Sequence, residues 1–237
     1  MLLSRRAFAE FLGTGLLVAA VVGSGIAASR LSPGDVGLQL FENAAATAAA
    51  LVAIILAVGP VSGGHINPVI TLIDRLTGAM TTTEAGVYIA SQVAGGAAGA
   101  IVANAMFSLP AVEVSTKTRS APGLVLAEAV ATFGLVLVVF GVTRSGRSAV
   151  APFAVASYIG AAYFFTASTS FANPAVTLAR MLSDTFAGIR PSSVPAFVAA
   201  QLVGGGMGIG AVSVLYPKGV RGRDVSPMKA REHVRDA

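Results

Sequence analysis

Two asparagines, each followed directly by proline, are the residues whose type and setting best suit contact with a small polar solute. Asn67 opens the run Asn-Pro-Val-Ile-Thr-Leu, and Asn173 opens the near copy Asn-Pro-Ala-Val-Thr-Leu. An Asn before a helix caps backbone N–H groups with its side-chain oxygen, and Pro is tolerated at the first helical position. The side-chain NH2 group is then left to donate a hydrogen bond. We therefore predict two solute-facing donors, in motifs that comprise Asn67, Pro68, Val69, Asn173, Pro174 and Ala175.

Each motif follows an apolar stretch and precedes only about ten helix-compatible residues, which predicts two half-helices that begin inside a bilayer. The segments before them, residues 62–66 and 169–172, must be non-helical, and a membrane interior tolerates such backbone only where it lines a cavity. Their carbonyls would accept hydrogen bonds from a solute, while the positive ends of the half-helices would repel cations and protons. In the alternative, both asparagines serve only as helix caps in a sealed bundle.

Glu10 and Glu128 are predicted to lie deep in apolar spans, where a carboxylate is expected to have a function. Their matching positions favour a bracing role, in which each accepts hydrogen bonds from backbone N–H groups of a non-helical segment; a proton relay is the alternative. His65 is expected to brace the same loop rather than bind a metal, because the only other histidine is His233. No nucleophile–base pair, phosphate loop or carboxylate dyad stands out, so we predict neither an enzyme nor a cofactor or metal site.

The elements that must position these residues are membrane-spanning helices. The 237 residues are 54% hydrophobic and 11% charged, against about 25% charged in soluble domains. Six apolar segments of spanning length lie near residues 7–27, 40–59, 84–106, 123–142, 149–167 and 194–215. The first is too long for a cleaved signal peptide. The absence of cysteine excludes disulfides and thiolate chemistry. We predict an all-α membrane protein.

The basic residues are distributed unevenly between the two sides of this predicted bundle. Of the 16 Lys and Arg residues, 11 fall on one side: Arg5, Arg6, Arg75, Arg144, Arg147 and the six between Lys218 and Arg235. By the positive-inside rule this side is cytoplasmic, and it holds both termini. The net charge of +5 then follows from topology, and no nucleic-acid partner is expected. Residues 216–237 are predicted to form a polar cytoplasmic tail, either solvated or in contact with lipid headgroups.

The chain also contains an internal repeat, with halves at about residues 5–110 and 122–215 of a single domain, 1–215. The order Glu, then Asn-Pro, then Gln-x-x-Gly-Gly occurs in both halves. The last of these motifs begins at Gln92 in the first half and at Gln201 in the second. Each half has three spans, an odd number, so the second half must be inverted and the two Asn ends must meet near the midplane. The Gly-x-x-x-Gly pairs that begin at Gly95 and Gly204 are typical of closely crossing helices, although glycine is common in membrane helices generally.

The doubled Asn-Pro box, the Ala-Glu-x-x-x-Thr sequences at Glu10 and Glu128, and the run Ser62-Gly63-Gly64-His65 resemble the aquaporin (major intrinsic protein) family over residues 5–215. The resemblance implies an aquaporin-like inverted repeat of six transmembrane helices and two re-entrant half-helices around one pore per subunit. It also implies a homotetramer in a lipid bilayer that conducts small neutral solutes such as water and polyols. The first box departs from the family pattern at Val69, where Ala is usual, and we expect only a small packing change there.

The selectivity filter that the family resemblance implies is also altered. Most aquaporins carry an Arg directly after the second box, where this chain has Val176. By family spacing the other filter positions are Thr47, Ala161 and Ser170, which implies a wide ring of small, uncharged residues without an aromatic side chain. Arg180, one helical turn beyond Val176, is a candidate for positive charge in the outer vestibule; a snorkelling surface Arg is the alternative.

Residues 169–177 resemble bacterial aquaporins associated with arsenic resistance, in which Val also replaces the Arg. This resemblance implies permeation of arsenite, As(OH)3, or methylarsenicals, and a place in the bacterial inner (cytoplasmic) membrane. A glycerol specialist fits less well, because Thr177 occupies the usual position of Asp in that subgroup. We predict a passive channel. The alternatives are a water and glycerol channel without an arsenic role, a coupled transporter on an inverted-repeat scaffold, and a structural protein with a closed pore.

Overall fold

A computed structural model describes residues 1–217, and every regular element in that range is helical. The α-helices are α1 (Leu3–Leu31), α2 (Val36–Ser62), α3 (Pro68–Leu76), α4 (Thr82–Met106), α5 (Pro122–Arg144), α6 (Ala151–Phe165), α7 (Pro174–Ala179) and α8 (Val194–Leu215). Short 3-10 helices are η1 (Ser148–Val150), η2 (Arg180–Leu182) and η3 (Pro191–Ser193). Six helices are long and apolar enough to cross a membrane, so the predicted all-α membrane fold is confirmed. Most of the predicted polar tail, residues 218–237, lies outside the described range.

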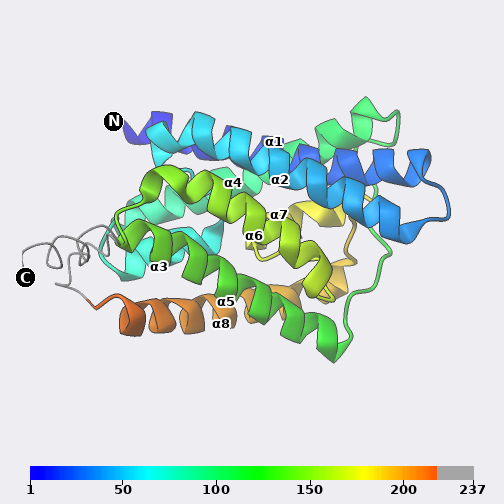
Figure 1. The fold of residues 1–237 in the computed structure, drawn as a ribbon. Helices are drawn as coiled ribbons and strands as arrows, with labels where there is room; N and C mark the ends of the chain where they lie inside the picture. The colour runs from blue at the N-terminus through cyan, green and yellow to red at the C-terminus, as the bar shows by residue number, and fades with distance from the viewer. Residues whose placement is uncertain (218–237) are drawn as a thin grey trace, which may run out of the picture.

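The two repeats pack as two groups of helices around a common centre (Figure 1). Helix α1 packs against α2 and α4 in the first repeat, and α5 packs against α6 and α8 in the second. The half-helices α3 and α7 begin near the middle of the bundle and run toward opposite ends (Figure 1). We call these the α3 end, where the N-terminus and the C-terminal end of α8 also lie (Figure 1), and the α7 end. The predicted inverted repeat with two half-helices is therefore present.

Within each repeat, the first and third spanning helices cross at glycine. A Cβ atom added to Gly95 of α4 would lie 2.1 Å from the carbonyl oxygen of Phe11 in α1. A Cβ atom added to Gly204 of α8 would lie 2.2 Å from the carbonyl oxygen of Ala129 in α5. No side chain fits within such distances, so only glycine allows these backbones to meet. The predicted close crossings are confirmed at both sites.

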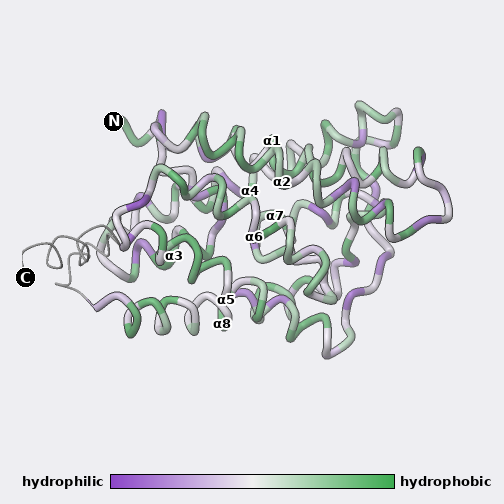
Figure 2. The backbone as a smooth tube through the Cα atoms, viewed as in Figure 1, coloured by the Kyte–Doolittle hydropathy of each residue, from purple (hydrophilic) through white to green (hydrophobic). Residues whose placement is uncertain are grey.

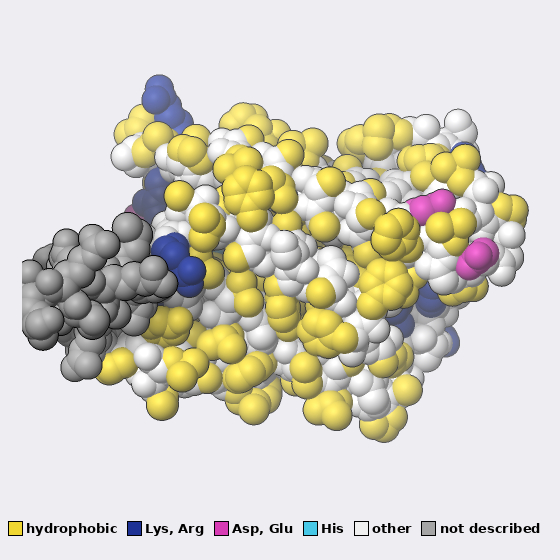
Figure 3. Space-filling model, viewed as in Figure 1, with side chains coloured by type: hydrophobic (Ala, Val, Ile, Leu, Met, Phe, Trp, Pro, Cys, Tyr) yellow, Lys and Arg dark blue, Asp and Glu magenta, His cyan; other side chains and the backbone are white. Residues whose placement is uncertain are grey.

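The flank of the bundle between its two ends is apolar. Hydrophobic residues follow the spanning helices in Figure 2 and cover the visible flank in Figure 3. Large apolar side chains of the spanning helices, such as Phe8 of α1, Phe41 of α2 and Phe153 of α6, are exposed. Exposed apolar surface on helices of spanning length suits contact with lipid tails rather than water. The chain is a multi-pass membrane protein.

Candidate functional site

A cavity of about 620 Å³ lies between the two repeats and reaches residues of both half-helices. Its wall is formed by side chains from α1, α2, α3, α5, α6 and α7 and from the segments that precede the half-helices. Its polar and charged lining residues are Thr47, His65, Asn67, Asp74, Thr143, Ser148, Tyr163, Ser170, Asn173 and Arg180. Both motif asparagines therefore line one cavity. This arrangement fits the predicted pore better than the alternative of a sealed bundle.

Each of these asparagines caps its own half-helix and also bonds to the loop of the other repeat. The Oδ1 atom of each accepts the backbone N–H two residues further on, at 2.9 and 3.0 Å. The Nδ2 atom of Asn67 donates to the carbonyl of Ala172 at 2.8 Å, and that of Asn173 donates to the carbonyl of Ile66 at 2.7 Å. An amide NH2 carries two hydrogens, so one on each Asn remains for a solute. The sequence predicted the caps, but it did not predict these bonds between the repeats.

The remaining residues of the two boxes are packed in the protein interior. Pro68 and Pro174 hold the first positions of α3 and α7, as predicted. Val69 and Ala175 are both buried. A Cβ atom on Gly205 would lie 2.4 Å from a methyl carbon of Val69, so the glycine leaves the room that the larger side chain needs. The unusual Val of the first box is accommodated by packing, without displacement of the half-helix from its cap.

The two buried glutamates hold the non-helical segments through their backbone. Glu10 accepts from the N–H groups of residues 65 and 66, at 3.0 and 2.6 Å, and Glu128 accepts from those of residues 171 and 172, both at 2.9 Å. A glutamine of the same repeat donates to each carboxylate, at 2.7 and 2.6 Å. The second residue of each pair has a left-handed backbone, with φ of 41° and 47°. These contacts support the bracing hypothesis, because they satisfy N–H groups that no helix can satisfy.

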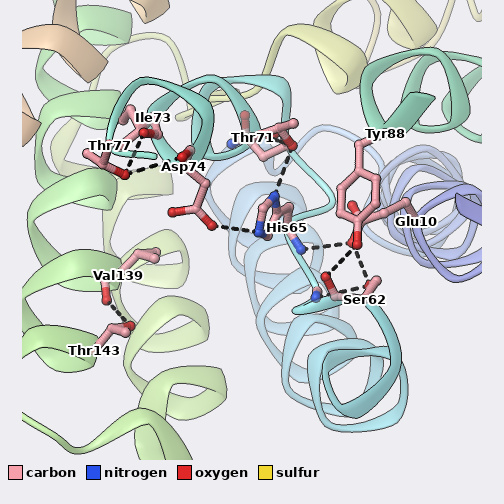
Figure 4. Close-up of polar contacts among 12 residues, drawn as sticks. Glu10, Ser62, His65, Thr71, Ile73, Asp74, Thr77, Tyr88, Val139 and Thr143 are labelled. Atoms are coloured by element: carbon pink, nitrogen blue, oxygen red, sulfur yellow. Dashed lines mark hydrogen bonds and ion pairs between the residues drawn. The ribbon is translucent and has the colours of Figure 1, made fainter. Parts of the chain in front are cut away.

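His65 also bonds within the first repeat, as Figure 4 shows. Its Nδ1 atom lies 3.1 Å from the hydroxyl of Thr71, and its Nε2 atom lies 2.9 Å from a carboxylate oxygen of Asp74. The ring also meets the edge of Tyr88, with centroids 5.3 Å apart. Within residues 1–217 no group of three potential metal ligands occurs, and these contacts support the bracing role. The sequence did not predict the pairing of His65 with Asp74. Asp74 lies on α3 one helical turn beyond Thr71, the other residue that contacts the His65 ring nitrogens.

The predicted filter residues are brought together only in part. Thr47, Ser170 and Val176 line the cavity, but Ala161 does not, and its side chain is exposed. Tyr163 lines the cavity instead, with its hydroxyl 3.1 Å from that of Thr47. The expected ring without an aromatic residue is therefore wrong.

The physical reason is the rotation of α6. Its cavity-lining residues recur at helical spacing, at Pro152, Val155, Ile159 and Tyr163. Ala161 lies two residues from both Ile159 and Tyr163, which places it on the opposite face of a helix with 3.6 residues per turn. The family spacing from the second box to α6 crosses the irregular residues 166–173, whereas the helical period of α6 itself identifies Tyr163.

Arg180 is buried at the α7 end of the cavity, with 2% of its surface exposed. Its Nε atom donates to the carbonyl of Ala187, and its Cζ atom lies 3.3 Å from the ring centroid of Phe171. The alternative of a snorkelling surface Arg is therefore wrong. Arg119, which the sequence did not single out, lies 5.0 Å from the same ring centroid and donates to the carbonyl of Gly188 at 2.9 Å.

Burial and hydrogen bonding are the main causes of the shifted pKa values in the nearby loop. Burial, and then repulsion by Arg119 and Arg180, lower the pKa of Lys117 to about 8. Burial also lowers the pKa of Arg119 to about 10. The pKa of the Asp184 carboxyl is lowered, chiefly because it accepts the backbone N–H of Thr116 at 2.9 Å. Of these three shifts, only that of Lys117 includes repulsion by the neighbouring arginines among its causes.

Known proteins are similar to this chain in sequence and in fold. Residues 1–172 match the family model described as Major intrinsic protein. The chain is 52% identical to a protein named Aquaglyceroporin AqpS from Rhizobium meliloti (strain 1021), over 85% of this chain and 86% of that protein. It is 34% identical to a Probable aquaporin TIP-type from Medicago truncatula, over 65% of this chain and 64% of that protein. The X-ray structure of the aquaglyceroporin from Plasmodium falciparum has the same fold, with a TM-score of 0.67 and 22% identity over 92% of this chain and 97% of that one.

Proposed function

Because the chain belongs to the major intrinsic protein family, whose members are channels and not enzymes, we propose that it conducts small uncharged solutes passively through the cavity between its repeats. One observation carries this proposal: Asn67 and Asn173, from oppositely directed half-helices, lie on the same cavity. Each offers one unused amide hydrogen to a solute oxygen. The half-helices also direct their positive N-terminal ends into the bundle, which opposes cations.

The solutes we propose are arsenite and methylarsenicals, with water and polyols also conducted. Val176 lines the cavity at the position where the family resemblance implies an Arg, and it offers neither charge nor a long side chain. Hydroxyl groups of Thr47, Tyr163 and Ser170 lie on the same cavity and can exchange hydrogen bonds with a hydroxylated solute. The high identity to a protein named as an aquaglyceroporin supports a polyhydroxylated solute class.

We further place the channel in the bacterial inner membrane as a homotetramer, with both termini in the cytoplasm. The apolar flank is the surface that lipid and neighbouring subunits would cover. Arg5, Arg6, Arg75, Arg144 and Arg147 supply the described part of the basic excess that assigns the α3 end to the cytoplasm.

Val176→Arg tests the solute assignment. The guanidinium would narrow the cavity and add fixed donors, so we expect arsenite and methylarsenical uptake to fall sharply while water permeability falls less or not at all. Uptake and osmotic swelling are measured in the same proteoliposomes and normalised to inserted protein. Val176→Ala, which keeps the site apolar and small, is the matched control and should retain arsenite flux. Unchanged arsenite flux in Val176→Arg would contradict a role for this position in selection.

The same vesicles test the transporter alternative. A passive channel equilibrates arsenite and stops, whatever ion gradient is imposed. A coupled transporter would accumulate arsenite against its gradient when a proton or sodium gradient is present. Water and glycerol flux without any arsenite flux would favour the alternative channel without an arsenic role. The absence of all solute flux would favour a closed structural protein.

A further inference from the structure

Residues of opposite charge occupy equivalent positions of the two repeats, Asp74 within α3 and Arg180 directly after α7. Asp74 follows Asn67 by seven residues, and Arg180 follows Asn173 by seven residues. Both side chains line the cavity, one at each end. Asp74 is paired with His65 at 2.9 Å, whereas Arg180 forms no ion pair with any of residues 1–217. Among the described residues, Arg180 therefore has no carboxylate within ion-pair distance, whereas the carboxylate of Asp74 is in contact with His65.

The guanidinium of Arg180 is held firmly but is only partly used. Its Nε atom is occupied by the carbonyl of Ala187, and its plane lies against the ring of Phe171. Neither Nη atom donates to a partner within residues 1–217. The two Nη groups form a fixed, planar pair of donors, which is the arrangement that binds two oxygens of one oxyanion.

A second polar group on the same cavity also lacks a partner. The hydroxyl of Ser170 is buried and has no hydrogen-bond partner in the described part of the chain. Its residue is held at a φ of 50°, a left-handed conformation that a serine rarely adopts. A buried hydroxyl without a partner is unfavourable, and a ligand that accepts its hydrogen after rotation of the Ser170 side chain about χ1 would remove that cost.

The carboxylates of Glu128 and Asp184 form no ion pair with Arg180. Both oxygens of Glu128 are occupied by backbone N–H groups of the loop, and one of them also by a glutamine. Asp184 is occupied by the backbone and side chain of Thr116. Arg119 and Lys117 add two further cations close by. Three cations, Arg180, Arg119 and Lys117, thus lie near two carboxylates, and the net positive charge of this group favours an anion.

We propose that the α7 end of the cavity binds a small, singly charged oxyanion, with two oxygens on the Nη groups of Arg180 and a further contact to the hydroxyl of Ser170. Carboxylates and monoanionic phosphonates or arsonates share this chemistry. This anion site rests on the proposed function only because it lies in the same cavity through which neutral solutes are proposed to pass. It adds a charged ligand class to a pore that otherwise selects neutral solutes, and a bound anion would obstruct neutral solutes.

Anion binding is measured on the purified protein in lipid nanodiscs, so that it does not depend on flux. The probes are methylphosphonate, followed by 31P NMR line broadening, and 13C-labelled acetate, followed by 13C line broadening. We expect saturable broadening by the wild-type protein with at least one probe. The response to the two probes then distinguishes a tetrahedral oxyanion from a carboxylate.

Three variants locate the site. Arg180→Gln should weaken binding about tenfold or more, because it removes the charge and the paired donors. Arg180→Lys keeps the charge but loses the planar fork, so its binding should be intermediate, and Ser170→Ala should weaken binding by a smaller factor. Arg30→Gln is the matched control, since Arg30 lies at the C-terminal end of α1 and donates only to the carbonyl of Phe107. Binding equal to wild type in Arg180→Gln would overturn the proposal.

Folding and flux controls keep the result interpretable. If Arg180→Gln does not fold, as judged by size-exclusion chromatography and thermal unfolding, unchanged binding in both Arg180→Lys and Ser170→Ala overturns the proposal. In proteoliposomes, external methylphosphonate or acetate should reduce wild-type glycerol or arsenite flux, and this inhibition should disappear in Arg180→Gln. Saturable binding that requires Arg180, in a protein that shows no neutral flux, would support the anion site and contradict the proposed channel function.

Discussion

At the residue scale, the two buried carboxylates show how a membrane protein can contain irregular backbone. Unpaired N–H groups are costly in a bilayer, and the loops before both half-helices expose several of them. Glu10 and Glu128 each accept hydrogen bonds from two consecutive backbone N–H groups and from the side-chain amide of one glutamine. All the oxygens of these carboxylates are thereby used as acceptors, which fits a bracing role better than a proton relay.

Glu128→Gln is expected to destabilise the second loop. The amide would turn one acceptor into an NH2 group that faces backbone donors, which would cost about 1–3 kcal/mol. Thermal unfolding in detergent measures this loss, and the pH profile of solute flux should keep its shape. Glu113→Gln, at an exposed loop position, is the control and should change neither quantity. A normally stable variant whose flux loses its pH dependence would favour the relay.

Lys117 leads to a prediction about pH. Its pKa in the folded protein is about 8, below the ordinary value of 10.5, so the folded state binds this proton more weakly than the unfolded state. Stability should therefore rise as pH increases from about 8 to 10, where the unfolded state alone keeps the charge. Melting temperatures of wild type and Lys117→Gln are compared across this range, so that other titrating groups cancel. An identical rise in both proteins would contradict the prediction.

At the scale of the element, the helices are positioned by their small residues and by their rotation. The crossings of α1 with α4 and of α5 with α8 depend on glycines with no room for a Cβ atom. The rotation of α6 decides that Tyr163, and not Ala161, contributes to the cavity. Element geometry therefore sets which side chains a solute meets.

Gly95→Ala is expected to separate α1 from α4. The new Cβ atom would overlap the carbonyl oxygen of Phe11, and a backbone shift of this kind typically costs about 1–3 kcal/mol. Gly86→Ala in the same helix meets nothing within 4 Å and is the control, with an expected change within about 1 kcal/mol. Thermal unfolding in the same detergent measures both. Equal stability of the two variants would show that the crossing tolerates a side chain.

At the scale of the whole molecule, the inverted repeat produces a pore with two different ends. The α3 end holds the Asp74–His65 pair, and the α7 end holds Arg180 and the neighbouring Arg119. The repeat makes the two half-helices equivalent in fold, while the charged residues make them different in chemistry. The orientation of the molecule in the membrane therefore decides which chemistry a solute meets first.

Single cysteines test the orientation, because the chain has none of its own. Leu2→Cys and Val112→Cys place a thiol at exposed positions near the α3 end and in the loop between α4 and α5. A membrane-impermeant maleimide should label Val112→Cys in intact cells and Leu2→Cys only after lysis, if the basic α3 end is cytoplasmic. The cysteine-free chain is the control. Labelling of Leu2→Cys in intact cells would reverse the orientation.

The sequence by itself determined the six spans, the two capped half-helices, the inverted repeat and the buried glutamates. These features depend on hydropathy, local capping chemistry and the repeated order of motifs, all of which are written along the chain. Only the tertiary structure decided that each Asn bonds to the opposite loop, that Tyr163 replaces Ala161 on the cavity, and that Arg180 is buried against Phe171. Those facts depend on how a helix is rotated and how two loops meet across the midplane. Contacts between residues as far apart as Asn67 and Ala172 have no local signature, because they form only when the two repeats pack together.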